Sequence, residues 1–286
     1  MADNRRKLVM VTNDDGVQSE GIIALAKAIR KNATVVIVGP EQPQSAAALS
    51  LTFHKPLRVS QTRKEGLACY AVSGSPGDSV MIGVNRIMFK RPDLVASGIN
   101  YGDNVTYQDI LASGTVAAAL EASLMGIPAI AFSMEVPEET IFSTNQAGVD
   151  FSRAAIIAGE IAHEVLEGGM PEGIDLINVN FPSHVTDDTE LRLTRIEKRK
   201  YMDKVLVRKD PRGRPYYWLW GQRLSTFKEN SDAFAVHSER AISISPMIVN
   251  MSGPFTEEME ELKKRVERRI SRVKSKGLSA PKDMGG

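Results

Sequence analysis

The chain has 286 residues, which suits one large α/β domain or one domain with an appendage. Its 42% hydrophobic and 25% charged residues are ordinary values for a soluble globular protein, and the sequence contains no repeats or low-complexity blocks. A formal net charge of +1 gives no overall electrostatic reason to bind a nucleic acid polymer or a membrane surface.

Apolar strands alternate with amphipathic helices through the first two thirds of the chain. The first strand starts at Leu8 and ends at two adjacent carboxylates and a glycine. This alternation predicts a three-layer, Rossmann-like α/β fold with a mostly parallel sheet. Further strands are predicted at 34–38, 67–72, 93–96, 128–132 and 175–180, and helices at 19–31, from 75–78 onward, at 113–124 and at 146–167.

The pattern changes near Pro182, which predicts a core at 1–182 and a C-terminal segment at 183–286. The segment should carry a β-hairpin at 203–221, whose aromatic residues need a partner surface because a short hairpin cannot bury them alone. The other elements expected there are strands at 191–196 and 205–207, a strand at 241–249 that returns to the core, a charged helix at 256–271 and a loose tail at 274–286.

One cysteine and the absence of long apolar runs bear on location. Cys69 cannot form an intramolecular disulfide, so we expect it to fill core space in a reducing compartment. No secretory signal precedes the first strand, and no apolar run approaches the ~20 residues that span a bilayer. These features predict a cytoplasmic protein without a membrane partner.

Asp14 and Asp15 directly follow the first predicted strand, and Gly16 lets the chain turn sharply. Ligands of open α/β sheets bind beyond the carboxyl ends of the strands. Two carboxylates at such a point repel each other unless a cation lies between them, and hard divalent cations prefer oxygen ligands. The pair therefore predicts a metal site, and the alternative is a turn whose aspartates cap a helix.

Other small polar segments follow neighbouring strands of the same predicted sheet. Ser45 and Asn100 can supply neutral oxygen ligands, and the backbone N–H groups of 113–115 can bind an anion at a helix N-terminus. Ser113 or Thr115 could instead be a simple N-cap. A carboxylate-bound metal beside an anion site is the arrangement used in phosphoryl transfer.

Short stretches in this order are typical of one family. They are Val11-Thr12-Asn13-Asp14-Asp15-Gly16, Gly39-Pro40 with Ser45-Ala46, Gly74-Ser75-Pro76-Gly77-Asp78, Ser97-Gly98-Ile99-Asn100 with Gly102 and Asn104, Ser113-Gly114-Thr115-Val116-Ala117-Ala118, Asn178-Val179-Asn180-Phe181-Pro182 and Ser243-Ile244-Ser245-Pro246. The set resembles the SurE family of stationary-phase survival proteins, which are metal-dependent nucleoside monophosphate phosphatases. The resemblance covers most of residues 7–250.

The resemblance implies a reaction and a set of site residues. It implies a 5′-nucleotidase that hydrolyses nucleoside 5′-monophosphates by means of a water molecule that one Mg²⁺ or Mn²⁺ ion activates. Nucleoside 3′-monophosphates are an alternative substrate. It also implies a homo-oligomer, dimer or tetramer, built by exchange of the C-terminal region. The implied metal ligands are Asp14, Asp15, Ser45 and Asn100, the phosphate-binding residues are Asn104, Ser113, Gly114 and Thr115, and the catalytic residues are Asp14, Asp15, Asn104 and Ser113.

The sequence departs from the family pattern at three places, which bear on substrate preference more than on the reaction. Ala112 replaces an aromatic residue before the Ser-Gly-Thr loop, 46–49 replaces a Gly-His pair, and 74–78 differs from the usual Gly-Thr-Pro-Ala-Asp. Alternative functions are a phosphatase active on short polyphosphates, a transferase for a nucleotide sugar, and a non-enzymatic nucleotide-binding oligomer. An aspartyl-phosphate mechanism is disfavoured, because Asn13 or Gly16 would take a position that needs a carboxylate.

Some other polar residues are given structural roles. Asp78 is expected to cap a helix, and His163 to be structural. The basic cluster at 198–200 is expected to form a solvated face, and His54 could approach the site from its loop.

Overall fold

The structure is a computed structural model that describes residues 6–137 and 148–275. Its internal contacts divide the chain into two compact units, Met1–Val249 and Asn250–Gly286. The first unit holds a nine-stranded sheet in the order β3-β4-β2-β1-β5-β6-β7-β11-β8. These strands are β1 (Leu8–Thr12), β2 (Thr34–Pro40), β3 (Val59–Lys64), β4 (Leu67–Val72), β5 (Leu94–Tyr101), β6 (Ala129–Met134), β7 (Leu176–Phe181), β8 (Leu191–Leu193) and β11 (Ile242–Met247).

The sheet is parallel through its six central strands, from β4 to β7. β3 pairs antiparallel with β4 at one edge, and β11 pairs antiparallel with β7 near the other. The helices of this unit are α1 (Glu20–Arg30), α2 (Pro76–Ile82), α3 (Thr106–Ala112), α4 (Gly114–Leu124), α5 (Ser152–Gly168) and α6 (Asp232–Phe234), with π-helical turns η1 (Gly83–Ile87) and η3 (Ala235–Glu239).

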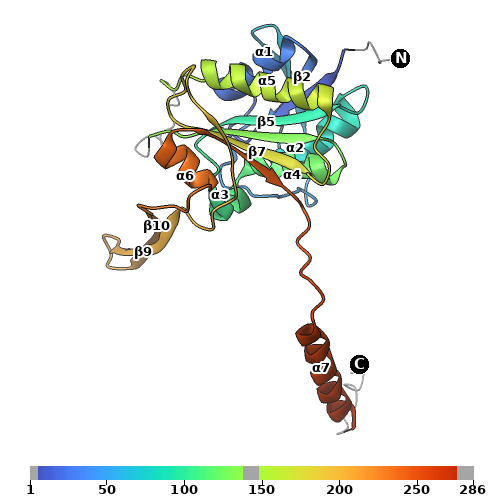
Figure 1. Ribbon diagram of the computed structural model, residues 1–286, viewed down its shortest axis with the longest axis vertical. Coiled ribbons are helices and arrows are strands. Elements are labelled where there is room, and N and C mark those ends of the chain that lie inside the picture. Colours follow the sequence, from blue (N-terminus) through green and yellow to red (C-terminus); the bar gives the residue numbers. More distant parts are fainter. Residues whose placement is uncertain (1–5, 138–147, 276–286) are drawn as a thin grey trace. The chain divides into compact units, whose positions relative to one another are not determined.

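Helices cover both faces of the sheet, which confirms the predicted three-layer α/β fold. Alternate residues of β1 belong to two separate apolar clusters: Val9 and Val11 pack with α1 and α5, and Leu8 and Met10 pack with α2 and α4. Figure 1 shows α1 and α5 on one side of the strands and α2 and α4 on the other. Cys69 is fully buried in the first cluster, as expected.

Several local predictions need correction. Ser75, not Asp78, is the N-cap of α2, and Asp78 is at position N3 of a capping box in which each side chain binds the other's backbone N–H. α5 begins at Ser152 rather than at residue 146, and residues 146–147 lie outside the described part of the chain. β3 was not predicted, because its mostly exposed polar residues lack an apolar run, and α3 and α6 were also missed.

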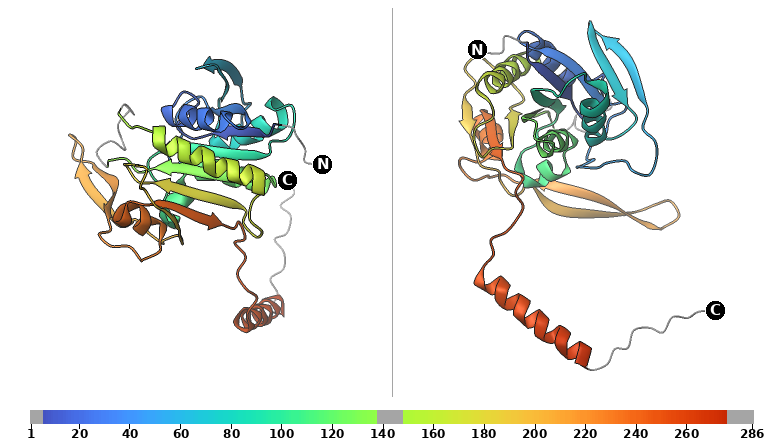
Figure 2. Two further views of the ribbon diagram at one scale, coloured as in Figure 1. Left: turned by 45° about the horizontal axis from the view of Figure 1, so that its top comes forward. Right: turned by 90° about the vertical axis from the view of Figure 1, so that its right-hand side faces the viewer.

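The predicted hairpin is confirmed as β9 (Tyr201–Lys209) paired antiparallel with β10 (Pro215–Arg223). Figures 1 and 2 show the two strands projecting away from the large sheet. Apolar side chains of the hairpin are exposed to solvent: 64% of Tyr217 and 87% of Leu219 is accessible. The hairpin therefore offers an apolar surface that its own unit does not cover.

In its described residues, the second unit contains the helix α7 (Glu257–Ser275), close to the predicted range. Four apolar residues at helical spacing are exposed along it, namely Met259, Leu262, Val266 and Ile270. The remainder of the predicted tail, from residue 276, lies outside the described residues. Among the helices that are described, none is long and apolar enough to cross a membrane.

Candidate functional site

Asp14 and Asp15 lie just beyond the end of β1, at the carboxyl edge of the parallel sheet. Gly16 has φ +92°, a conformation that glycine adopts without strain, and the chain then turns so that Val17 N donates to Pro40 O at 3.1 Å. Thr12 pairs with Ser97 of β5, so the two carboxylates lie beside the end of that strand. The predicted sharp turn is thus present, and it places two acids at the sheet edge.

Asp14 is the more buried acid, with 6% of its surface accessible. Burial raises the pKa of its carboxyl group, although the Thr115 hydroxyl and the backbone N–H groups of Gly114 and Thr115 act in the opposite direction. The Thr115 hydroxyl donates to Asp14 Oδ1. The first turn of α4 thus faces a carboxylate, which is the kind of group that a helix N-terminus favours.

Asp15 and Asn100 meet at the end of β5. Asp15 Oδ2 accepts a hydrogen bond from Tyr101 N at 3.0 Å. Asn100 Nδ2 donates to Gly102 O at 2.7 Å, so the side-chain oxygen of Asn100 is the atom that could bind a cation.

The loop that carries Ser45 is held between the acidic pair and the start of α4. Gln44 N donates to Asp14 O at 2.8 Å, and Ala48 N donates to Ala112 O at 3.0 Å. Ser45 itself is exposed between these two anchors. Two backbone hydrogen bonds thus bring a loop from beyond β2 to the ends of β1 and α3.

Ser113 is the N-cap of α4, because its hydroxyl accepts from Val116 N at 3.1 Å. This matches the capping alternative for Ser113, whereas the Thr115 hydroxyl binds Asp14 instead. Gly114 lies so close to Asp14 that a Cβ there would sit 2.7 Å from Asp14 Cβ. Glycine is therefore required at this contact between the helix and the acid.

Asn104 is buried over the ends of β6 and β7, and its hydrogen bonds there are with residues of these two strands. Its backbone N donates to Asn180 Oδ1 at 2.7 Å, its side-chain Nδ2 donates to Ser133 Oγ at 2.8 Å, and its carbonyl accepts from Asn178 Nδ2 at 2.9 Å. Sequence reasoning assigned no role to these three partners. The sequence feature that could have identified these partners is that they are polar residues inside otherwise apolar strands.

Three buried oxygens near the acidic pair have no hydrogen-bond partner in the described part of the protein. They are Thr12 Oγ1, Asn13 Oδ1 and Ser97 Oγ. Two carboxylates with unpartnered oxygens on neighbouring residues are the kind of donor set that a hard divalent cation prefers. No group of three or more His, Cys, Asp or Glu residues suited to a metal occurs in the described ranges, so neutral oxygens would have to complete the coordination.

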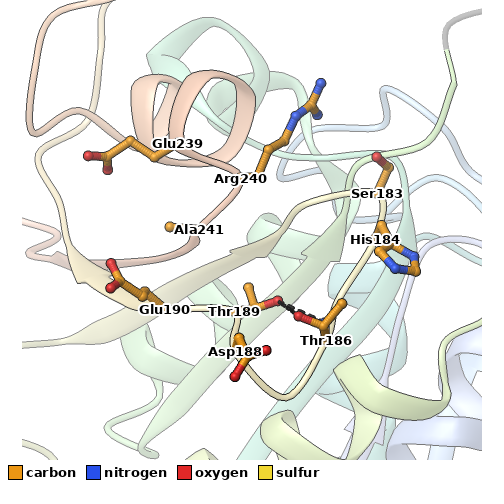
Figure 3. Close-up of a pocket in the computed structure, with 9 residues that line it drawn as sticks. All are labelled: Ser183, His184, Thr186, Asp188, Thr189, Glu190, Glu239, Arg240 and Ala241. Carbon is orange, nitrogen blue, oxygen red and sulfur yellow. Dashed lines mark hydrogen bonds between the residues drawn. The ribbon is translucent and has the colours of Figure 1, made fainter.

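A depression of about 520 Å³ lies elsewhere on the molecule (Figure 3). Of the predicted site residues, all of which the structure describes, none lines it. It lies between the loop after β7 and the turn that precedes β11, and its lining residues are Ser183, His184, Thr186, Asp188, Thr189, Glu190, Glu239, Arg240 and Ala241.

The prediction of a solvated basic face is wrong for Lys200. Only 4% of this residue is accessible, and its Nζ lies 2.7 Å from Asp103 Oδ1 and 3.0 Å from Asp109 Oδ2. Burial works against the charged form, but the two carboxylates raise the pKa of Lys200 above its ordinary value. His54, by contrast, is exposed in its loop.

His237 joins the same buried cluster, which sequence reasoning did not find. Its Nε2 lies 3.0 Å from Asp103 Oδ2, and its Nδ1 lies 2.9 Å from Glu135 Oε1. Burial opposes its charged form, but hydrogen bonds to these carboxylates raise its pKa. No local pattern could have identified the cluster, because Asp103 and His237 lie far apart in the sequence.

The fold and the sheet-edge residues define an α/β protein with an oxygen-rich acidic site beside a helix N-terminus. Residues 9–203 match the protein family described as Survival protein SurE. The chain belongs to the SurE family.

Relatives and a solved structure cover most of the chain. A protein named 5′-nucleotidase SurE from Methanocella arvoryzae is 44% identical over 246 residues, which are 85% of this chain and 92% of the relative. One from Hyperthermus butylicus is 40% identical over 91% of this chain and 92% of its own length. The crystal structure of the SurE protein from Aquifex aeolicus superposes with a TM-score of 0.75 at 32% identity, covering 92% of this chain and 99% of that one.

Proposed function

We propose that this protein is a metal-dependent 5′-nucleotidase that hydrolyses nucleoside 5′-monophosphates to nucleoside and phosphate, with nucleoside 3′-monophosphates as a second candidate substrate. The observation that carries the proposal is the position of Asp14 and Asp15 at the sheet edge, with the first turn of α4 against Asp14. Membership of the SurE family and relatives named 5′-nucleotidase support it.

The proposal assigns a role to each candidate residue. When bound, one Mg²⁺ or Mn²⁺ ion would polarise the phosphate and make a water more acidic. The ion would be held by oxygens of Asp14, Asp15, Ser45 and Asn100.

The phosphate would be bound by Asn104 and by the segment Ser113–Thr115, and the positive end of the α4 dipole would stabilise charge on the non-bridging oxygens. Either Asp14 or Asp15 would orient the attacking water and accept its proton. The Asp14 carboxylate accepts a hydrogen bond from the Thr115 hydroxyl, which holds it in place beside α4.

A phosphate-release assay tests the proposed function. The purified protein is expected to release phosphate from nucleoside 5′-monophosphates with Mg²⁺ or Mn²⁺ present, and to lose this activity in excess EDTA because the oxygen ligands then lack their cation. Short-chain polyphosphate and a 3′-monophosphate should be measured in parallel, since both remain candidate substrates. Binding of the nucleotide without any phosphate release would identify a nucleotide-binding oligomer and contradict the proposal.

A homo-oligomer, dimer or tetramer, is also part of the proposal. The exposed apolar residues of β9, β10 and α7 support it, because unpaired apolar surfaces of this kind are usually covered by another chain. Light scattering is expected to give at least twice the 31.3 kDa of one chain. A monomer at micromolar concentration would contradict this, and truncation before Gly253 should weaken the oligomer while the candidate metal ligands remain.

Two further predictions stand as part of this proposal. The core at 1–182 is proposed to carry the catalysis, and the segment at 183–286 is proposed to carry the contacts between subunits. Within one chain, β8 and β11 of that segment belong to the large sheet, and the first compact unit extends to Val249. A cytoplasmic location is proposed from the single cysteine.

A further inference from the structure

Lys200 is a buried lysine at the base of the β9–β10 hairpin. Its carbonyl accepts from Leu224 N at 2.9 Å, which closes the hairpin base. Its ammonium group contacts two carboxylates, Asp103 at 2.7 Å and Asp109 at 3.0 Å. One cation thus bridges two points that lie six residues apart in the chain.

Each of the two bridged aspartates is linked to one of the candidate phosphate-binding residues. Asp103 directly precedes Asn104. Asp109 lies in α3, and its carbonyl accepts from Ser113 N at 2.8 Å. The bridge therefore joins the residue before Asn104 to the turn of α3 that hydrogen-bonds to Ser113.

Other contacts hold the bridge in place. Gln108 Oε1 accepts from Lys200 N at 3.2 Å and from Tyr201 N at 3.1 Å, so α3 is docked on the hairpin base. On its other side, Asp103 lies 3.0 Å from His237 Nε2. The position of Asp103 is thus fixed from the hairpin and from η3 together.

The energetics favour a positional role for this bridge. A buried ion pair contributes little net stability, because desolvation offsets the attraction and an apolar replacement is often as stable. A lysine between two aspartates does what an apolar side chain cannot: it holds at a fixed separation two carboxylates that otherwise repel each other. The free-energy cost of burying the Lys200 charge is therefore consistent with a need to hold Asp103 and Asp109 at a fixed separation.

We propose that Lys200 is a positioning residue for phosphate binding, acting through Asp103 on Asn104 and through Asp109 on Ser113. The inference rests on the proposed function, since it takes these two residues as phosphate ligands. Lys200 does not touch the substrate in this scheme. It sets the distance between two groups that do.

The test compares Lys200→Met with the native protein and with Lys198→Met, a matched control at an exposed lysine two residues away. The KM for a nucleoside 5′-monophosphate and the inhibition constant of inorganic phosphate are expected to rise about tenfold or more in Lys200→Met, because small displacements of binding groups are costly. The kcat and the Mn²⁺ concentration for half activation should change much less. Lys198→Met should behave as the native protein.

A second variant distinguishes the loss of positioning from the destabilisation that an unpaired buried charge causes. Lys200→Met/Asp103→Asn/Asp109→Asn leaves no unpaired buried charge, so its melting temperature should recover towards the native value while phosphate binding stays weak. This variant also carries the test if Lys200→Met fails to fold. Lys200→Arg keeps the charge and should restore part of the phosphate affinity.

Binding of inorganic phosphate, measured as the rise in melting temperature that it causes, gives a readout that does not need turnover. Native phosphate affinity in folded Lys200→Met, or affinity that recovers together with melting temperature in the triple variant, would overturn the inference but leave the proposed function intact. A native protein that neither binds phosphate nor releases it from any nucleotide would overturn both.

Discussion

Replacing Asp14 with asparagine is expected to lower phosphate release about 100-fold or more while the fold survives. The substitution removes half of the negative charge proposed to hold the metal, and loss of one electrostatic group in an active site commonly costs this much. Asp15→Asn should have a similar effect. Activity should be measured over a Mn²⁺ titration, because a weakened metal site shifts the titration to higher concentration.

Asp14→Asn is expected to lower activity but not to lower the stability of the metal-free protein. Burial holds the pKa of Asp14 above its unfolded value of 3.8, so the ionised carboxylate destabilises the metal-free protein as pH rises through the folded-state pKa. Asp14→Asn should therefore melt at the same or a higher temperature than the native protein in EDTA at neutral pH. Asp187→Asn, at an exposed acid paired with exposed Arg153, is the matched control for both measurements. Full activity in Asp14→Asn would exclude a role in catalysis.

Gly114→Ala is expected to lower activity about 100-fold without unfolding the protein. The added Cβ would lie 2.7 Å from Asp14 Cβ and 2.9 Å from Asp14 Oδ2, closer than side-chain carbons approach in real proteins. Either the acid or the first turn of α4 must move, which displaces candidate metal and phosphate ligands together. Kinetics of phosphate release and the inhibition constant of inorganic phosphate provide the measurement.

Gly168→Ala is the control for this substitution, since the new Cβ at the end of α5 meets nothing within 4 Å. It should leave the kinetics unchanged and slightly stabilise the helix. Native kinetics in Gly114→Ala would mean that the contact between α4 and Asp14 has no part in the reaction.

Much of the fold could be predicted because its main elements carry local patterns. The residues of α1 that the spacing placed inward, Ile22, Leu25, Ala26 and Ile29, are all buried. The hairpin at 203–221 was found because a turn sequence separates two β-rich runs. β3 was missed because an exposed edge strand needs no apolar face, and its pairing with β4 supplies the stabilisation.

The candidate site shows the same division. Parallel topology alone implied that 14–15, 97–100 and 113–115 meet at one edge of the sheet, and the structure brings Asp14 against Gly114 and Thr115. The sequence could not show that the N–H groups of α4 face Asp14 itself, or that Asn104 binds the ends of β6 and β7. These contacts depend on side-chain directions that the folded backbone sets.

The sequence by itself determined the alternation of the main strands and helices, the family and the acidic strand end, because each depends on a local pattern or motif. Only the tertiary structure decided that Lys200 is buried, because the local composition predicted a solvated face. Its burial results from Asp103 and Asp109, 97 and 91 residues away in the chain. Whether a charge is solvated or buried depends on which distant segments pack around it, and that information exists only once the chain has folded.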